Sequence, residues 1–171
     1  MTRRVLTDER GVAAIEFALI AGFLAMAMLN ALDIARFFYQ RMEVENASQM
    51  GAQSAWKTCD VSLLPASVNC PNLVTAVTSA VQSTSLGTSV TLKAGSPAEG
   101  YYCLNGSNAL VRVSDVSSKP TDCSSAGNAS GSPADYIKVE TSFTYTPLFG
   151  SLSVGSMLPT SITAMSIMRL Q

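Results

Sequence analysis

The chain has 171 residues, enough for one ordinary domain and an additional anchor segment. Only 13% of its residues are charged, about half of the ~25% found in typical soluble domains. The net charge is −1 and the basic residues form no tract beyond the first ten positions. This composition argues against a nucleic-acid-binding protein, which needs a footprint of Lys and Arg.

An apolar run follows the basic N-terminus and contains a single ionisable side chain, Glu16. Residues 12–32 read VAAIEFALIAGFLAMAMLNAL. As a helix they would extend roughly 31 Å, about one hydrocarbon thickness of a bilayer. A cleaved signal peptide has a shorter apolar region of about 7–15 residues, with a break after it, and no break follows here. We therefore predict a transmembrane helix, with Arg3, Arg4 and Arg10 on its cytoplasmic side.

The helical pattern continues beyond the apolar run without a proline. Through residues 33–57 one face recurs at three- and four-residue steps, which predicts an amphipathic helix. This face consists of Ile34, Phe37, Phe38, Arg41, Val44, Ala47, Gly51 and Ala55. One helix from about Val12 to about Lys57 would be roughly 69 Å long and would exceed a bilayer. Its second half must therefore pack against the rest of the chain outside the membrane.

Four cysteines, Cys59, Cys70, Cys103 and Cys123, all follow the apolar run. An even number in a polar, loop-rich region predicts two disulfides in an oxidising compartment. Zinc is the alternative, but the chain has no C-x-x-C pair and no histidine. Three pairings are possible, and we expect the local one, Cys59–Cys70 with Cys103–Cys123, because it closes the shortest loops.

The remaining residues predict a short helix and a sheet. A helical apolar face lies between Pro71 and Gly87. Four runs of alternating apolar and polar residues follow, at 88–95, 109–116, 135–147 and 161–170. We therefore predict an α+β fold in which the long N-terminal helix packs on a four-stranded antiparallel sheet, with one further short helix.

The loop at 147–159 carries apolar residues with two alternative roles. They tuck under the sheet, which is the commoner arrangement, or they stand exposed for a partner. These residues are Leu148, Phe149, Leu152 and Met157.

The N-terminal region resembles a known family. RGVAAIEFALIAGF, followed by DIARFFYQRMEVENASQMGAQSAW, looks like the start of TadE-like proteins, which are minor pseudopilins of the tight-adherence (Flp-type) pilus system. The resemblance covers residues 10–57, and more loosely YIKVETSFTYTPLFG and SITAMSIMRL. Two departures, Gly22 near the place of a common proline and Ala35 in place of a common glycine, affect the shape of the helix. The matching positions are Gly11, Glu16, Phe17, Arg36, Phe38 and Tyr39.

The resemblance implies cleavage after Gly11 by a prepilin peptidase. Residues 1–11 would be a cytoplasmic leader, 12–32 the transmembrane and assembly helix, and 33–171 an extracytoplasmic pilin-like head that includes the amphipathic helix half 33–57. Val12 would then carry a new α-amino group, positive near pH 7. Glu16, with Phe17 beside it, would meet that amino group on a neighbouring subunit. The simpler alternative is that Glu16 reaches back to water at the membrane boundary.

These features favour a structural protein and not an enzyme. We expect a minor pseudopilin in the inner membrane, with its head in the periplasm or on the cell-surface pilus, that helps initiate, assemble or cap a filament used in adhesion and biofilm formation. Its partners would be the prepilin peptidase, other pilin or pseudopilin subunits, the assembly platform of this secretion system and the lipid bilayer, with no nucleic acid, metal or cofactor. A non-polymerising, single-pass receptor or adhesion module is the alternative. No catalytic motif is visible, and a Ser–Lys dyad using Lys119 or Lys138 is the remaining enzymatic alternative.

Overall fold

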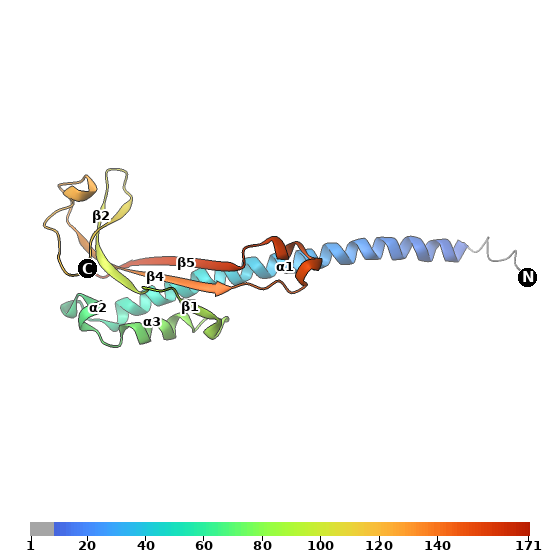
Figure 1. Cartoon of the computed structure of the whole chain (residues 1–171), viewed down its shortest axis with the longest axis horizontal. Coiled ribbons are helices and arrows are strands. Elements are labelled where there is room, and N and C mark those ends of the chain that lie inside the picture. Colours follow the sequence, from blue (N-terminus) through green and yellow to red (C-terminus); the bar gives the residue numbers. More distant parts are fainter. Residues whose placement is uncertain (1–8) are drawn as a thin grey trace, which may run out of the picture. The chain divides into compact units, whose positions relative to one another are not determined.

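The computed structural model describes residues 9–171, so most of the predicted leader, with Arg3 and Arg4, lies outside the described residues. The fold is α+β, as predicted, and is drawn in Figure 1. Its helices are α1 (Glu9–Thr58), α2 (Ala66–Asn69) and α3 (Leu73–Val81). Its strands are β1 (Val90–Leu92), β2 (Ala98–Leu104), β3 (Leu110–Ser114), β4 (Ala134–Thr144) and β5 (Ser161–Arg169). Short 3-10 turns complete it: η2 (Val61–Leu63), η3 (Gly87–Ser89), η4 (Ser124–Ala126), η5 (Gly150–Leu152) and η6 (Val154–Met157).

Helix α1 is one continuous element of 50 residues that passes through Leu32 and Asp33 without a break. The absence of proline permits this length, since an internal proline would remove a backbone hydrogen bond and kink the helix. The described chain divides into two compact units, and α1 contributes to both. The smaller unit contains the chain up to Tyr39 together with Thr146–Pro159, and the larger contains Gln40–Tyr145 and Thr160–Gln171.

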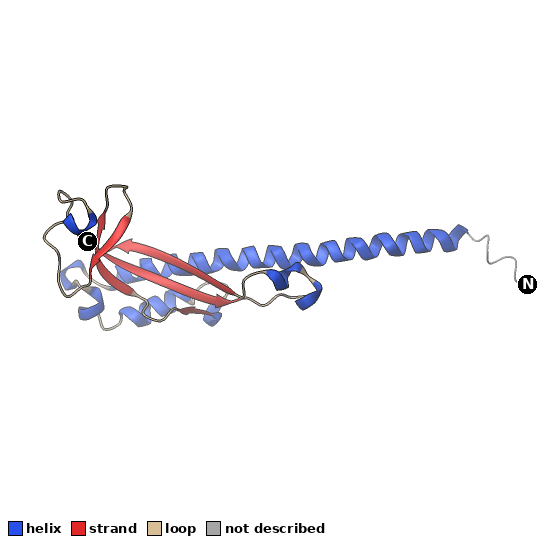
Figure 2. Ribbon diagram, turned by 45° about the horizontal axis from the view of Figure 1, so that its top comes forward, coloured by secondary structure: helices blue, strands red, loops and turns tan. Residues whose placement is uncertain are grey.

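The sheet of the larger unit is built around β4. Strands β1 and β2 pair with one edge of β4, β5 pairs with the other, and β3 pairs with β2, all antiparallel (Figure 2). Along β4 the side chains of Asp135, Ile137, Val139 and Thr141 are buried, and those between them are partly exposed. This period of two is typical of a strand with one covered face.

The second half of α1 covers that face, together with α3. Thr141 donates a hydrogen bond from Oγ1 to the carbonyl oxygen of Val44, at 3.3 Å. A Cβ at Gly51 would lie 2.8 Å from Val81 and 3.0 Å from Val139, so only glycine permits this close approach. The prediction that this half of α1 packs on the sheet is confirmed.

The buried face of α1 is rotated relative to the predicted one. Ile34, Phe38 and Arg41 were expected on it, but all three side chains are exposed. The buried residues are Asp33, Phe37, Gln40, Val44, Ala47, Ser48, Gly51, Ala52 and Ala55. The other five predicted residues are buried, and the small ones among them let the helix approach the sheet closely, as expected.

One strand, β2, was not predicted. Its sequence AEGYYCL does not alternate, and its register with β3 shifts between Tyr101 and Tyr102. Gly100 is also required there, because a Cβ would lie 2.7 Å from Arg112 Nε and 2.8 Å from the Ser114 carbonyl oxygen. The sheet therefore has five strands instead of four, and α2 adds a second short helix.

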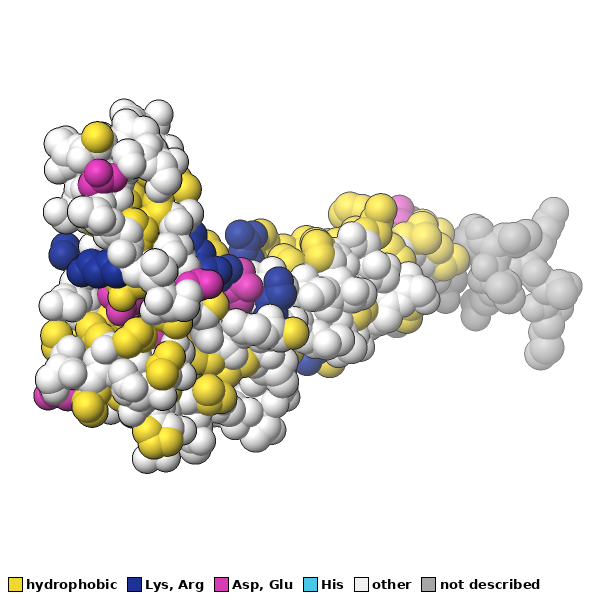
Figure 3. All heavy atoms as spheres, turned by 60° about the vertical axis from the view of Figure 1, so that its left-hand side comes forward, with side chains coloured by type: hydrophobic (Ala, Val, Ile, Leu, Met, Phe, Trp, Pro, Cys, Tyr) yellow, Lys and Arg dark blue, Asp and Glu magenta, His cyan; other side chains and the backbone are white. Residues whose placement is uncertain are grey.

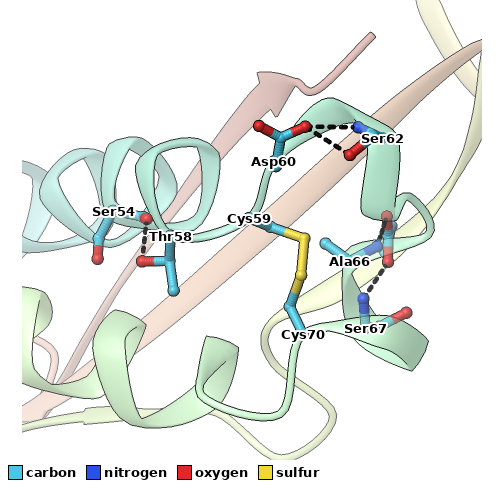
Figure 4. Close-up of a disulfide and its surroundings, with 9 residues drawn as sticks. Ser54, Thr58, Cys59, Asp60, Ser62, Ala66, Ser67 and Cys70 are labelled. Atoms are coloured by element: carbon cyan, nitrogen blue, oxygen red, sulfur yellow. Dashed lines mark hydrogen bonds between the residues drawn. A yellow bond between two sulfur atoms is a disulfide. The ribbon is translucent and has the colours of Figure 1, made fainter.

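The larger unit contains two disulfides, Cys59–Cys70 and Cys103–Cys123. The first joins the end of α1 to the residue that follows α2 (Figure 4). The second joins β2 to the segment before η4. Each closes a short loop, with sequence separations of 11 and 20 residues. In the chain-entropy model a disulfide that closes a loop of this length stabilises the folded state by about 3 kcal/mol.

Candidate functional site

The first part of α1 exposes large apolar side chains with no protein cover. The helix contains a window with a mean hydropathy of 2.3, none of which is buried, so by length and composition it can cross a membrane. Apolar side chains line this part of α1 in Figure 3. Phe17 and Phe23 are 73% and 76% exposed. Because contiguous apolar surface of this extent is rare in soluble monomers, this segment requires a lipid or protein environment.

The residues predicted for processing and assembly lie at the start of this segment. Val12, Glu16 and Phe17 are all exposed on α1. No hydrogen bond or ion pair of Glu16 is found within residues 11–171. A Cβ at Gly11 would meet nothing within 4 Å, so the fold of the single chain does not require glycine there.

A loop is fastened to α1 just where the apolar segment ends. We call Thr146–Pro159, which includes η5 and η6, the collar loop. The fully buried carboxylate of Asp33 accepts hydrogen bonds from Leu148 N (2.7 Å), Phe149 N (3.4 Å) and Ser153 Oγ. Asn30, one turn earlier, accepts a hydrogen bond from Val154 N at 2.7 Å.

Arg36 completes this set of side chains. Its Nη1 donates to the Thr146 carbonyl oxygen at 3.5 Å. Asn30, Asp33 and Arg36 thus hold the collar loop at three-residue intervals along α1. Gly155 belongs to the same contact, because a Cβ there would lie 2.8 Å from Asp33 Oδ2 and 2.9 Å from Ser153 Oγ.

The environment of Asp33 keeps it ionised. Burial by itself would raise its pKa. The hydrogen bonds from Ser153, Leu148 and Phe149 and the charge of Arg36 outweigh burial, so the pKa of Asp33 lies below its ordinary value. A carboxylate directly after the apolar segment therefore serves as the anchor of the collar loop.

The collar loop turns apolar side chains outward. Leu148 is 60% exposed, Leu152 72% and Met157 84%. The expectation that these residues tuck under the sheet is therefore wrong for these three, and the fourth, Phe149, is partly exposed. Polar atoms of the loop, including the N–H groups of Leu148, Phe149 and Val154, face α1 instead.

The head contains a second buried acidic group, formed by Glu99 and Asp135. Glu99 accepts hydrogen bonds from Ala66 N (2.7 Å) and Ser67 N (2.6 Å), at the start of α2. Asp135 hydrogen-bonds with Glu99, and its Oδ1 has no partner among the described residues. Burial, followed by the charge of Glu99 and the hydrogen bond with it, raises the pKa of Asp135 to about 7, although Lys119 acts in the opposite direction.

The lysines considered for a Ser–Lys dyad have other neighbours. Lys138 Nζ lies 3.3 Å from Glu140 Oε1. Lys119 Nζ lies 5.8 Å from the centre of the Tyr101 ring. Within residues 11–171 no three His, Cys, Asp or Glu side chains are grouped so that they would hold a metal ion.

Comparison with known protein families finds a match in the N-terminal region. Residues 11–53 match the family model described as TadE-like protein. The N-terminal segment is TadE-like. The resemblance named from the sequence is thereby confirmed for this segment, which contains Gly11, Glu16, Asp33 and Arg36. No curated protein and no solved structure matches the chain at a significant level.

The TadE-like segment, the long apolar helix α1 and the two disulfides are consistent with a membrane protein related to the Tad pilus. The structure places Gly11, Val12, Glu16 and Phe17 together on one exposed helix start, and the four cysteines in the larger unit. Sequence reasoning missed the role of Asp33. The sequence feature that could have indicated this role is an acidic residue directly after an apolar run. If such a residue is buried, its carboxylate needs hydrogen-bond donors from elsewhere in the chain.

Proposed function

We propose that the protein is a minor pseudopilin of a tight-adherence (Flp-type) pilus. It is held in the inner membrane by residues 12–32 and carries its head in the periplasm. A prepilin peptidase removes the leader after Gly11, and the mature subunit helps initiate, assemble or cap the filament. The observation that carries the proposal is a single helix, α1, with an exposed, apolar and TadE-like first part and a second part that forms the core of a disulfide-bonded head.

Glu16 is the residue through which subunits recognise one another in this proposal. An unpaired carboxylate is strongly disfavoured in apolar surroundings, and Glu16 has no partner in the described part of its own chain. Cleavage after Gly11 creates a cationic amino group on Val12 of each subunit. Pairing of Glu16 with that group on a neighbour satisfies both charges and sets the register of the two helices.

The proposed role is structural. The TadE-like family is associated with pili and is not a family of enzymes, and association with other pilus subunits in a membrane assembly follows from this family. The pocket beside Cys103–Cys123 has a volume of about 190 Å³ and is lined by residues such as Tyr102, Asn128 and Arg169. We assign no reaction to it.

N-terminal mass spectrometry after co-expression with a prepilin peptidase tests the processing step. The wild-type chain is expected to begin at Val12, and Gly11→Ala is expected to remain full-length. Gly22→Ala is the matched control, because a Cβ at either glycine meets nothing within 4 Å, and it should be processed normally. A wild-type chain that is inserted but never cleaved would favour the non-polymerising receptor instead.

Glu16→Val tests the assembly step. The variant should be cleaved after Gly11 as efficiently as wild type, because the cut site is unchanged, yet incorporate poorly into pili. Counting the subunit in sheared pili by immunoblot measures this. Normal incorporation of the cleaved variant would rule out Glu16 as the residue that sets subunit register.

A further inference from the structure

The collar loop lies at the height on α1 where a membrane span would end. It is hydrogen-bonded to Asn30 and Asp33. From Val12 the helix rises by roughly 27 Å to Asn30 and roughly 32 Å to Asp33, at ~1.5 Å per residue. The hydrocarbon core of a bilayer is about 30 Å thick. When residues 12–32 span the bilayer, the collar loop therefore lies at the boundary between acyl chains and headgroups.

The composition and exposure of the collar loop suit that boundary. The loop, TPLFGSLSVGSMLP, contains no charged residue. Large apolar side chains of the loop are strongly exposed, with Leu152 72% and Met157 84% exposed. Amphipathic helices that lie in the membrane interface bury their apolar face about 5–10 Å into the boundary between headgroups and acyl chains, and the exposed side chains of the collar loop are suited to the same region.

The backbone of the collar loop is also suited to a region with little water. Unpaired N–H groups are costly there. Leu152 N donates to Phe149 O at 3.1 Å, and Leu158 N donates to Gly155 O at 3.2 Å. The N–H groups of Leu148 and Val154 are taken up by α1. Several polar backbone groups of the loop are therefore satisfied within the loop or by α1.

We propose that the collar loop is a membrane-surface contact, in which Leu148, Leu152 and Met157 insert among the lipids of the periplasmic leaflet and set the depth of α1 in the bilayer. Lipid is the occupant because the exposed apolar surface of α1 continues directly to the level of the loop, and the same bilayer covers both. The anchor at Asp33 transmits the loop's position to the helix. This inference rests on the proposed insertion of residues 12–32. It adds that a subunit leaving the membrane must also withdraw its collar loop.

Depth-dependent tryptophan quenching in the full chain tests this proposal. The protein has one tryptophan, Trp56, so Trp56→Phe provides a silent background. In that background Met157→Trp places a probe in the collar loop and Phe23→Trp places one in the span. Val68→Trp places the matched control probe in the head, because Val68 is 68% exposed on α2, in the other unit. Each variant is reconstituted in phosphatidylethanolamine–phosphatidylglycerol vesicles that contain brominated lipids. The bromine atoms lie either near the headgroup or near the end of the acyl chain.

The expected result has three parts. The collar-loop probe is quenched by bromine near the headgroup more than by bromine near the chain end, the span probe is quenched by deep bromine, and the head probe is not quenched. If the span probe is quenched while neither the collar-loop probe nor the head probe is quenched, the collar loop does not contact the membrane and the inference fails, although insertion stands. If the span probe is not quenched, insertion fails and the inference fails with it.

Two further outcomes would also overturn the inference. Equal quenching of the collar-loop and head probes would mean that the whole head lies on the vesicle and that the collar loop has no special role. An emission of the collar-loop probe that shifts to the blue with increasing protein-to-lipid ratio, without quenching by bromine, would mean that a second copy of the chain covers the loop.

Discussion

Asp33 on α1 and Asp135 on β4 are both buried carboxyl groups, yet their pKa values shift in opposite directions. Asp33 receives three hydrogen-bond donors and lies near the cationic Arg36. Asp135 faces the carboxyl group of Glu99, and one of its oxygens has no partner within the described residues. Burial raises the pKa in both cases, so the donors and neighbouring charges decide the outcome.

The two carboxyl groups therefore affect stability at different pH values. The pKa of Asp33 is lowered in the folded state, so its contribution is present at neutral pH and is lost only as pH falls through that lowered value. The pKa of Asp135 is raised from 3.8 to about 7, so the folded state holds its proton more tightly than the unfolded state. The corresponding contribution is full below 3.8 and is lost as pH rises to about 7.

Asp33→Ala should have the largest effect, because it removes the acceptor for three donors of the collar loop. We expect amide hydrogen exchange in residues 146–159 to become roughly tenfold to a hundredfold faster, as expected when hydrogen bonds to a charged group are lost. Exchange in β4 should stay unchanged. Asp33→Asn, which keeps one acceptor oxygen, should lie between alanine and wild type. Unchanged exchange in Asp33→Ala would mean that other contacts hold the loop.

Gly155→Ala should weaken the same anchor from the opposite side. The new Cβ would lie 2.8 Å from Asp33 Oδ2, and relieving such overpacking typically costs about 1–3 kcal/mol. Limited proteolysis should therefore cut the collar loop faster while the larger unit stays intact. Ser151→Ala is the matched control, since Ser151 is exposed in the same loop. Equal cleavage of the two variants would contradict a tight fit at Gly155.

The parts of this fold that were predicted correctly depend on local sequence patterns. An uninterrupted helical periodicity without proline predicted α1, and strict alternation predicted β4 and β5. The strand β2 escaped prediction because Gly100 and a register shift break its alternation. Periodicity detects a strand only when each successive side chain follows the pleat.

The residues of the candidate site also divide into those that a local sequence pattern reveals and those that only the fold brings together. Gly11 and Glu16 were visible because they lie within one short segment of sequence. Asp33 and Leu148 are 115 positions apart, and Glu99 meets Asp135 because β2 pairs with β4. No local sequence pattern encodes such contacts. A buried acidic side chain does, however, require either hydrogen-bond donors or a raised pKa.

Asp135→Asn should stabilise the head at alkaline pH, because it removes a charge that the buried pair accommodates poorly. We expect the gain in the free energy of unfolding to be on the order of 2 kcal/mol larger at pH 8 than at pH 5, because wild-type Asp135 becomes ionised in the folded state between these two pH values. Urea unfolding at both pH values measures this. Asp122→Asn is the control, because Asp122 is exposed and its pKa is lowered by Ser124. A gain that is equal at both pH values would show that Asp135 does not titrate in this range.

Lys119→Gln should have the smallest effect of these substitutions. It tests how strongly the charge of Lys119 influences the protonation of the pair formed by Glu99 and Asp135. The charge of Lys119 lowers the pKa of Asp135, whereas burial and Glu99 raise it. Removing that charge should raise the pKa of Asp135 further, by a fraction of the shift that burial and Glu99 produce. Titration of the Asp135 carboxyl carbon by NMR follows this directly, with Lys93→Gln as the control because Lys93 does not contribute to the pKa of Asp135. A pKa of Asp135 that falls in Lys119→Gln would mean that the lysine screens Glu99 more than it attracts Asp135. A shift in either direction would show that the protonation of Asp135 depends on Lys119 as well as on Glu99.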